Sequence, residues 1–384
     1  MQTQERIAAK YREIYHRSPR LFRSPGRINL IGEHTDYNDG FVLPASVDKA
    51  VYFAIEPRED GNVELYAADL DEHYHFSLDD LSKPSRQWPV FQLSVLDQLR
   101  KKGIGIGGFQ AVFGGDIPSG AGMSSSAALE CCLLFALNEI YSLGLSRLDI
   151  VLMAQKAENE FVGVNCGIMD QFASVFGKPG SVIRLDCRNL DYQYYPFVLE
   201  GYSLVLCDTT VKHSLAGSEY NTRRKECESG VSVLQKYYPG AKSLRDVSVD
   251  QVESHREEMG DNVYRRCRFI TREIQRVPEA CQLLLENQAQ AFGAKMYETH
   301  DGLQHDYEVS CEELDFLVDF TRPLPEVAGA RMMGGGFGGC TINLVRSGEL
   351  DSFEKQVKEA YFEAFGRELP CYRVEIGTGT EEIR

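Results

Sequence analysis

A glycine- and serine-rich segment at residues 118–126, PSGAGMSSS, carries the clearest chemical signal of the sequence. It follows a predicted strand and opens a predicted helix. Gly120 and Gly122 allow the backbone to approach a ligand closely, because glycine has no Cβ atom. Ser124 to Ser126 offer hydroxyls and N–H groups at a helix N-terminus, where the helix dipole favours an anion. A structural cap would need only one serine, so the segment predicts a phosphate-binding loop.

This loop differs from the Walker A loop. No G-x-x-x-x-G-K-[ST] motif occurs in the sequence, and without the loop lysine a metal ion must neutralise more of the phosphate charge. Two G-x-G-x-x-G matches are also present, at residues 103–108 and 334–339. The first precedes a predicted strand and the second leads into a strand with no helix between them. Neither match therefore predicts a dinucleotide site.

The second of these matches belongs to a segment that reads MGGGFGGC, residues 333–340, between two predicted strands. A structural hairpin uses one or two glycines, and this segment has five in six positions. Backbone that lies against a ligand would explain them, and so would a flexible turn. Both interpretations stay open at this point.

A third polar group follows an apolar predicted strand. Glu33, His34 and Asp36 form a dense cluster of hydrogen-bonding side chains. Carboxylates accept hydrogen bonds from paired hydroxyls, so a polyol is a natural ligand. A polar loop that makes its own turn hydrogen bonds is an equal alternative from the spacing alone.

The bulk properties exclude several classes of partner. The formal net charge of -16 argues against nucleic acid or an anionic membrane surface, because a binder of phosphate polymers needs a basic face. The 11 cysteines include no C-x-x-C pair, so neither a zinc site nor a disulfide framework is indicated. The first residues place Ile7, Tyr11 and Ile14 at helical spacing and lack the apolar run of a signal peptide. We therefore expect a cytoplasmic protein.

The 384 residues are enough for two lobes that share a cleft. Hydrophobic patterning and turn signals predict helices after the opening one at Phe91–Lys102, Ser124–Tyr141, Arg147–Phe161 and Leu350–Phe365. They predict strands at Leu21–Ile31, Phe41–Val47, Ala50–Glu56, Val63–Ala68, Phe109–Phe113, Ser181–Asp186, Tyr202–Asp208, Val327–Met332, Cys340–Val345 and Tyr372–Ile376. Segregated strands and helices in both halves predict an α+β fold, with the boundary near residues 190–200.

Taken together and in this order, the three segments resemble those of the GHMP kinases. The run GRINLIGEHTDYNDGFVLP, residues 26–44, resembles the signature of the galactokinase branch. The resemblance implies a two-lobed fold: residues 1–195 would resemble the second domain of a small-ribosomal-subunit protein, and residues 196–384 would form a ferredoxin-like lobe. The active site would lie in the cleft between the lobes of a monomer.

The resemblance also implies a reaction, ATP-dependent phosphorylation of D-galactose at O1, the first committed step of galactose catabolism. Asp170, within the run CGIMDQF at residues 166–172, would face the O1 hydroxyl as a general base or an orienting group. Arg27 would stabilise the transferring phosphoryl group and hold Asp170 ionised, or would form only a structural ion pair with it. Without the resemblance, Asp170 is an unremarkable acid.

The remaining roles follow from the same resemblance. Ser126 and Glu158 would hold Mg²⁺, and the aromatic rings of Trp88 and Phe91 would stack on adenine. A single tryptophan is equally often a core residue, so packing in the core is an alternative for Trp88. The phosphates of ATP would bind Gly120, Ala121, Gly122, Met123, Ser124, Ser125 and Ser126. The sugar would bind Glu33, His34, Thr35, Asp36, Gly167 and Tyr220.

Two alternatives remain. A sibling sugar kinase would act on N-acetylgalactosamine, arabinose or galacturonate, because the motifs do not fix the substituents at C2 and C5 of the sugar. A non-catalytic sensor would bind ATP and galactose only to regulate a partner. Sensors of this kind typically lose part of the serine-alanine loop. Ser126, Ala127 and Asp170 are all present here, which favours the enzyme.

Overall fold

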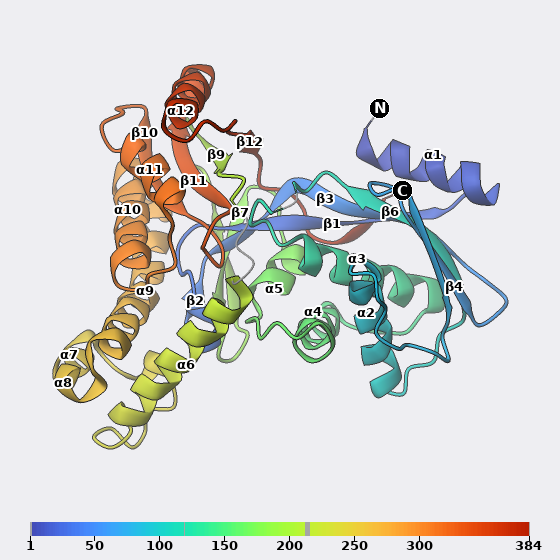
Figure 1. Cartoon of the computed structure of the whole chain (residues 1–384), viewed down its shortest axis with the longest axis horizontal. Helices are drawn as coiled ribbons and strands as arrows, with labels where there is room; N and C mark the ends of the chain where they lie inside the picture. Colours follow the sequence, from blue (N-terminus) through green and yellow to red (C-terminus); the bar gives the residue numbers. More distant parts are fainter. Residues whose placement is uncertain (1, 119, 212–215, 384) are drawn as a thin grey trace.

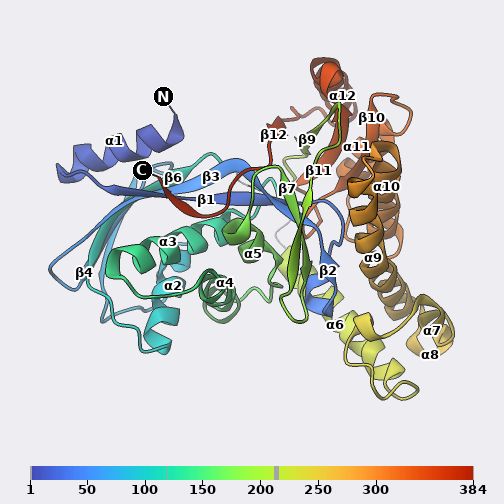
Figure 2. The ribbon, with the colours of Figure 1, turned by 180° about the vertical axis from the view of Figure 1, so that it is seen from behind.

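The computed structural model describes residues 2–118, 120–211 and 216–383, so Ser119 of the predicted phosphate loop lies outside the described residues. Two halves lie side by side (Figure 1), each built on its own sheet with helices packed against it. A third, smaller sheet lies between them (Figure 2). Strands and helices are segregated in both halves, which confirms the predicted α+β class.

The first sheet has the strand order β13-β1-β3-β6-β4-β5. Side chains on β3 alternate between its faces, as the period of a strand requires: Val51 and Phe53 pack in the main core, whereas Tyr52 and Ala54 face α1. The bounds of these strands are β1 (Arg20–Asn29), β3 (Pro44–Pro57), β4 (Asn62–Ala67), β5 (Glu72–Ser77), β6 (Phe109–Gly115) and β13 (Glu381–Ile383).

Helices cover both faces of this sheet. The opening helix α1 lies on one face, and α2, α3, α4 and α5 lie on the other (Figure 1). In α3 the run ALECCLLFAL is buried nearly all round, because α3 packs on the sheet and also contacts α2, α4 and α5. The bounds are α1 (Thr3–Tyr15), α2 (Pro89–Lys101), α3 (Ser125–Tyr141), α4 (Arg147–Lys156) and α5 (Met169–Phe176).

The second sheet has the order β10-β11-β9-β12, and all its neighbouring strands are antiparallel. Numbered along the chain this order is 2-3-1-4, which is ferredoxin-like and confirms that prediction. The strands are β9 (Tyr202–Asp208), β10 (Val327–Met332), β11 (Cys340–Arg346) and β12 (Cys371–Val374).

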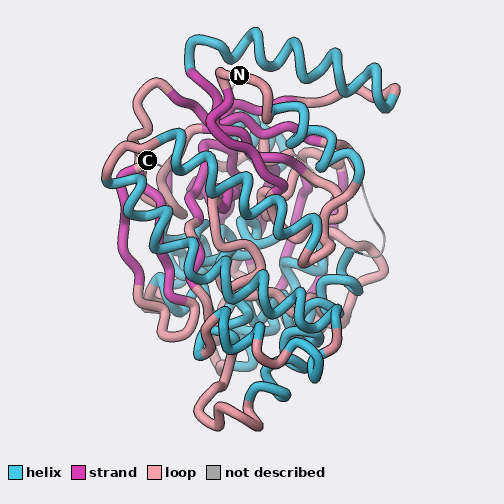
Figure 3. Tube along the Cα trace, turned by 90° about the vertical axis from the view of Figure 1, so that its left-hand side faces the viewer, coloured by secondary structure: helices cyan, strands magenta, loops and turns pink. Residues whose placement is uncertain are grey.

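Helices of the second half pack on this sheet and extend beyond it. The long helices α9 and α10 lie on its outer side (Figure 1) and face the viewer in Figure 3. The bounds are α6 (Ala216–Leu234), α7 (Val249–Glu253), α8 (Arg256–Met259), α9 (Asp261–Leu285), α10 (Ala289–His305), α11 (Glu312–Thr321) and α12 (Leu350–Phe365).

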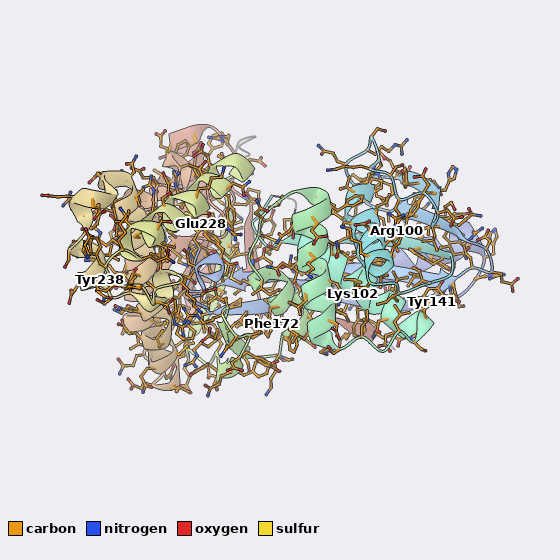
Figure 4. The ribbon with its side chains drawn as sticks, turned by 90° about the horizontal axis from the view of Figure 1, so that it is seen from below. Arg100, Lys102, Tyr141, Phe172, Glu228 and Tyr238 are labelled. Atoms are coloured by element: carbon orange, nitrogen blue, oxygen red, sulfur yellow. The ribbon has the colours of Figure 1, made fainter. Side chains whose placement is uncertain are left out.

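The two halves share a core. The small sheet, β2 (Phe41–Val42), β7 (Ser181–Asp186) and β8 (Tyr192–Pro196), has the order β2-β7-β8. One buried cluster joins Leu43 and Val182 of this region to Leu206 and Phe292 of the second half. In the view from below, Phe172 of α5 lies between Glu228 of α6 and Arg100 of α2 (Figure 4). The boundary predicted at residue 195 falls at the end of β8, although β13 returns to the first sheet beside β1.

Two predicted elements differ in the structure. The strands predicted at Phe41–Val47 and Ala50–Glu56 are instead the short β2 and one continuous β3. Between the two predicted strands, the Asp48 N–H donates to the Glu375 carbonyl (2.9 Å) and the Ala50 N–H donates to the Asp116 carboxylate (2.7 Å). These contacts keep the backbone extended.

The helix predicted at Arg147–Phe161 is the second difference. Regular α4 ends at Lys156, and the chain continues as a π-helical turn over Ala157–Val162. Such turns are rare and often occur at functional sites. Glu158 lies on this turn.

Candidate active site

Two adjoining cavities lie next to the predicted motifs. The first, of about 230 Å³, is lined from both halves of the molecule by Arg27, Glu33, His34, Asp36, Glu158, Val164, Cys166, Gly167, Met169, Asp170, Tyr220 and Gly334–Gly336. The second, of about 340 Å³, is lined by Val51, Ala67, Asp69, Leu70, Trp88, Phe91, Phe113, Gly114, Gly115, Ile117, Ser125, Ser126 and Leu129. The Ser126 hydroxyl of the second cavity donates to Glu158 of the first at 3.0 Å.

Asp170 lines the first cavity and accepts hydrogen bonds from two side chains. It lies in the first turn of α5, and Arg27 binds it with two hydrogen bonds, Nε to Oδ1 at 2.7 Å and Nη2 to Oδ2 at 2.9 Å. The Ser124 hydroxyl also donates to Oδ2. Such a two-pronged pair fixes the plane of the carboxylate. The predicted ion pair is therefore present, while contact between Arg27 and a phosphoryl group stays a prediction.

A bulge in β1 brings the first motif to the phosphate loop. The register between β1 and β3 shifts between Pro25 and Arg27, and a Cβ on Gly26 would meet the Met123 carbonyl oxygen at 2.8 Å. That carbonyl accepts the Arg27 N–H at 3.1 Å, and the Arg27 Nη1 donates to the Gly122 carbonyl. Glycine at position 26 is thus required for the loop and the arginine to meet.

Ser124 occupies the N-cap position of α3 with φ of 53° and makes no cap hydrogen bond with its side chain. Its hydroxyl donates a hydrogen bond to Asp170 instead. Ser124 therefore does not act as a side-chain cap of α3. Met123 and Ala121 are buried in the core shared by the halves, while Ser125 and Ser126 face the second cavity. The loop thus presents its serines and buries its apolar side chains.

Asp36 lies directly against Gly167. A Cβ on Gly167 would come within 1.8 Å of Asp36 Oδ2, so only glycine leaves room for the carboxylate. Burial raises the pKa of Asp36 to about 7, and the nearby charges of Asp170 and Glu33 add to this increase. The cavity therefore has a concentrated negative potential that hydroxyl donors or a cation would relieve.

Glu33 connects the two halves. Its Oε2 accepts hydrogen bonds from Arg331 Nη2 at 2.8 Å and from the Gly334 N–H at 3.1 Å. Arg331 is fully buried and also donates to the carbonyls of Asn29, Leu30 and Met332. A buried ion pair of this kind holds the end of β1 against β10.

The second glycine-rich segment packs on the phosphate loop as well as on the cavity. A Cβ on Gly334 would lie 3.6 Å from the Gly122 carbonyl oxygen, and a Cβ on Gly336 would collide with the Val309 carbonyl at 2.1 Å. Gly335 and its neighbours line the first cavity. Close approach of backbones thus explains part of the glycine content, and the expected contact with a ligand stays a prediction.

His34 and Tyr220 complete the wall of the cavity, with ring centroids 5.4 Å apart. His34 Nδ1 forms a hydrogen bond of 2.8 Å with the Tyr37 hydroxyl. Burial lowers the pKa of His34 to about 3, with Arg223 and Arg331 adding to the effect. His34 is therefore neutral at physiological pH. Thr35 lies outside the lining, because its hydroxyl donates to the carbonyls of Gly32 and Phe41 within the turn.

Glu158 is held by three side chains. Ser126 donates to its Oε1, and Gln171 Nε2 donates to Oε2 at 2.8 Å beside the Cys166 thiol. Burial and the charge of Asp170 raise the pKa of Glu158 to about 7. No group of three or more His, Cys, Asp or Glu side chains suited to a metal occurs among the described residues. A hydroxyl and one carboxylate nevertheless fit Mg²⁺, which keeps several waters and takes phosphate oxygens.

The second cavity has an aromatic wall. Trp88 Nε1 donates to Glu72 at 2.8 Å, and the indole packs against Phe113 with centroids 5.5 Å apart. Phe91 lines the same cavity. Both aromatic residues thus lie beside Ser125 and Ser126, where a base attached to bound phosphates could reach them.

Sequence reasoning missed Arg331, Gln171 and Cys166. Arg331 lies two residues before the second glycine-rich segment, but a single arginine in a predicted strand does not by itself indicate a buried ion pair. Gln171 follows Asp170 and Cys166 precedes Gly167, so their proximity to predicted site residues was the only available indication.

Comparison with known proteins shows to which broad class of proteins this chain belongs. The description GHMP kinases N terminal domain matches residues 91–178 and GHMP kinases C terminal matches residues 280–363. A mevalonate kinase structure, 16% identical, has the same fold with a TM-score of 0.63 over 93% of this chain and 98% of its own. The Galactokinase galactose-binding signature matches residues 9–57.

Relatives with higher sequence identity show which family within the GHMP kinases this chain belongs to. Galactokinase of Roseiflexus sp. (strain RS-1) is 40% identical over 378 residues, 98% of this chain and 96% of its own. Galactokinase of Thermosipho africanus is 40% identical over 94% of this chain and 99% of its own. The crystal structure of Lactococcus lactis galactokinase complexed with galactose is 35% identical, with a TM-score of 0.93 and 98% of both chains covered. This chain belongs to the galactokinase family of the GHMP kinases.

Within the described part of the chain, no helix is both long and apolar enough to cross a membrane.

Proposed function

We propose that this protein transfers the γ-phosphoryl group of ATP to the O1 hydroxyl of D-galactose, giving galactose 1-phosphate and ADP. The observation that carries the proposal is the pair of adjoining cavities. One is rich in carboxylates and fits a polyol, and the other has aromatic and serine-rich walls that fit a nucleotide. The Ser126–Glu158 contact joins them, and Asp170 lines the first cavity close to it. Membership of the galactokinase family supports the same reaction.

In this proposal Asp170 accepts a hydrogen bond from the O1 hydroxyl and orients the oxygen for in-line attack on phosphorus. Arg27 holds the carboxylate in its plane, and Ser124 fixes the second oxygen. As the bond to phosphorus forms, the hydroxyl proton passes to Asp170 or to the departing phosphate, and ADP leaves with the bonding electron pair. The Arg27 charge stabilises the negative charge that gathers at this end of the cavity.

The other groups bind and position the substrates. Asp36, Glu33 and Tyr220 surround the sugar, and the loop serines bind the phosphates. Ser126 and Glu158 would hold Mg²⁺, which supplies neutralisation of phosphate charge when bound with ATP. Glu158 suits this role because burial beside Asp170 makes its ionised form costly until a cation compensates it.

A substrate panel tests the proposal. ADP release is measured with magnesium, ATP and one of four sugars: galactose, N-acetylgalactosamine, arabinose or galacturonate. We expect the highest kcat/KM with galactose. Faster turnover of another sugar would support the sibling-kinase alternative. Saturable galactose binding without ADP release from any sugar would support the sensor alternative instead.

A further inference from the structure

Four side chains form one hydrogen-bonded chain that starts at the first cavity, the proposed sugar site, and ends inside the second half of the molecule. His34 Nδ1 lies 2.8 Å from the Tyr37 hydroxyl, and that hydroxyl lies 2.8 Å from the hydroxyl of Tyr307. The Tyr307 hydroxyl lies 3.4 Å from the sulfur of Cys227 on α6. Tyr307 is fully buried and Cys227 is 1% exposed. The reaction proposed above uses none of the three residues behind His34.

At neutral pH each of the four side chains is uncharged and has one proton that it can donate in a hydrogen bond. Burial lowers the pKa of His34 to about 3, so its ring is neutral and holds a single N–H. Burial also raises the pKa of Tyr37 and of Tyr307 well above the usual value, and raises the pKa of Cys227 to about 12. The protons can therefore point in only two concerted directions, toward His34 or toward Cys227.

The two ends of the chain differ as acceptors. An imidazole nitrogen accepts a hydrogen bond well, whereas a thiol sulfur accepts only weakly. The chain is therefore more stable with Tyr307 donating to Tyr37 and Tyr37 donating to His34 Nδ1. The opposite direction would place the Tyr307 proton on the poorest acceptor of the four.

The cavity side of His34 agrees with this direction. With Nδ1 accepting, the ring proton must lie on Nε2, which is buried and makes no hydrogen bond to a described residue. Asp36 and Glu33 line the same cavity and are acceptors, so an Nε2–H adds a donor that their carboxylates cannot supply.

We propose that the chain through Tyr37, Tyr307 and Cys227 fixes the tautomer of His34 with the proton on Nε2. His34 is then a hydrogen-bond donor to a hydroxyl oxygen of the sugar, while the neighbouring carboxylates accept hydroxyl protons. Tyr37 and Tyr307 are positioning residues that act through His34. The identity of the ligand rests on the proposed function, but the tautomer does not.

The tautomer can be measured directly in the intact protein without any ligand. Long-range proton–nitrogen correlation NMR of ¹⁵N-histidine-labelled protein distinguishes a protonated from an unprotonated ring nitrogen, and His34→Gln assigns the signal. We expect a protonated Nε2 and an unprotonated Nδ1. A His34 signal with the proton on Nδ1 would overturn the proposal. Absent ADP release from the wild type would instead defeat the proposed function and leave the tautomer result standing.

Two variants test the positioning role. Tyr37→Phe removes the donor to Nδ1, so we expect Nδ1–H to become populated and KM for galactose to rise about three- to tenfold, with kcat within about twofold, as expected for one lost hydrogen bond. Tyr307→Phe should shift the same signals less, because Tyr37 keeps its own proton. Tyr297→Phe, which loses a hydrogen bond to Thr321 away from the cavity, is the matched control. An unchanged His34 tautomer and KM in Tyr37→Phe would contradict the role.

Discussion

At the scale of single residues, the Asp170 carboxylate is defined by what surrounds it. Its two oxygens accept two hydrogen bonds from Arg27 and one from Ser124. A carboxylate bound in this way is a well-fixed hydrogen-bond acceptor. We therefore infer that its main contribution is to orient the attacking hydroxyl.

Asp36 gives a prediction at the same scale. Burial raises the pKa of Asp36 to about 7 from a usual value of 3.8. Between pH 3.8 and about pH 7, Asp36 is therefore protonated in the folded protein and ionised in the unfolded chain. The free energy of unfolding therefore falls as the pH rises through this window. In the unliganded protein, Asp36→Asn should increase the free energy of unfolding by about 1–3 kcal/mol at pH 8, with the gain shrinking toward pH 4, while galactose affinity is lost.

Urea unfolding at the two pH values measures this effect. Asp351→Asn serves as the control, because its side chain is 94% exposed and should show no such pH-dependent gain. Lower stability of Asp36→Asn than of the wild type at pH 8 would mean that the Asp36 carboxylate is adequately solvated or paired.

At the scale of helices and strands, the sequence predicted those elements whose formation depends on the local pattern of residues. The phosphate loop, the helix after it and most strands follow from glycine, serine and hydrophobic spacing. The continuous β3 and the π-helical turn at Ala157–Val162 were missed, because tertiary hydrogen bonds and packing decide them. Asp170 could be assigned a role only through the family resemblance, since its partner Arg27 is 143 residues away in the chain.

Adding one methyl group at Gly167 tests the contact between the loop before α5 and the turn after β1. In Gly167→Ala the new Cβ would overlap Asp36 Oδ2, at 1.8 Å, so the carboxylate must move away from its position in the first cavity. We expect KM for galactose to rise at least about tenfold, as for loss of a charged hydrogen-bonding group, with ATP affinity unchanged.

Gly105→Ala is the matched control for this prediction. A Cβ there would meet nothing within 4 Å, and kinetics should match the wild type. Isothermal titration with each substrate separates the two affinities. Normal galactose binding in Gly167→Ala would show that the turn adapts at little cost.

At the scale of the whole molecule, contacts between residues far apart in the sequence assemble the first cavity. Arg331 of β10 reaches Glu33 and the carbonyls at the end of β1. Glu273 of α9 accepts the Gly32 N–H at 2.7 Å, directly before Glu33. The shared core of Leu43, Leu206 and Phe292 supports both contacts. The motif at the end of β1 is therefore shaped from the second half of the molecule.

This arrangement predicts that Arg331→Met is severely destabilising, by about 3–5 kcal/mol in the free energy of unfolding, because Glu33 is left buried and unpaired. Galactose affinity should fall with it. Lys355→Met is the control: Lys355 and its partner Glu359 both have mostly exposed side chains, and such surface pairs contribute about 1 kcal/mol or less. Chemical denaturation compares the two variants. A loss for Arg331→Met no larger than that of the control would contradict the bridging role.

The central claim is phosphoryl transfer to O1 with Asp170 as the group that orients it. Phosphorus NMR of the wild type with magnesium, ATP and galactose should show ADP and one sugar phosphate in equal amounts, with the phosphorus coupled to the proton on C1. In Asp170→Asn that product should form at least about 10³-fold more slowly, while galactose binding measured by titration persists. Phosphate on another carbon, or near-normal turnover by Asp170→Asn, would contradict the account.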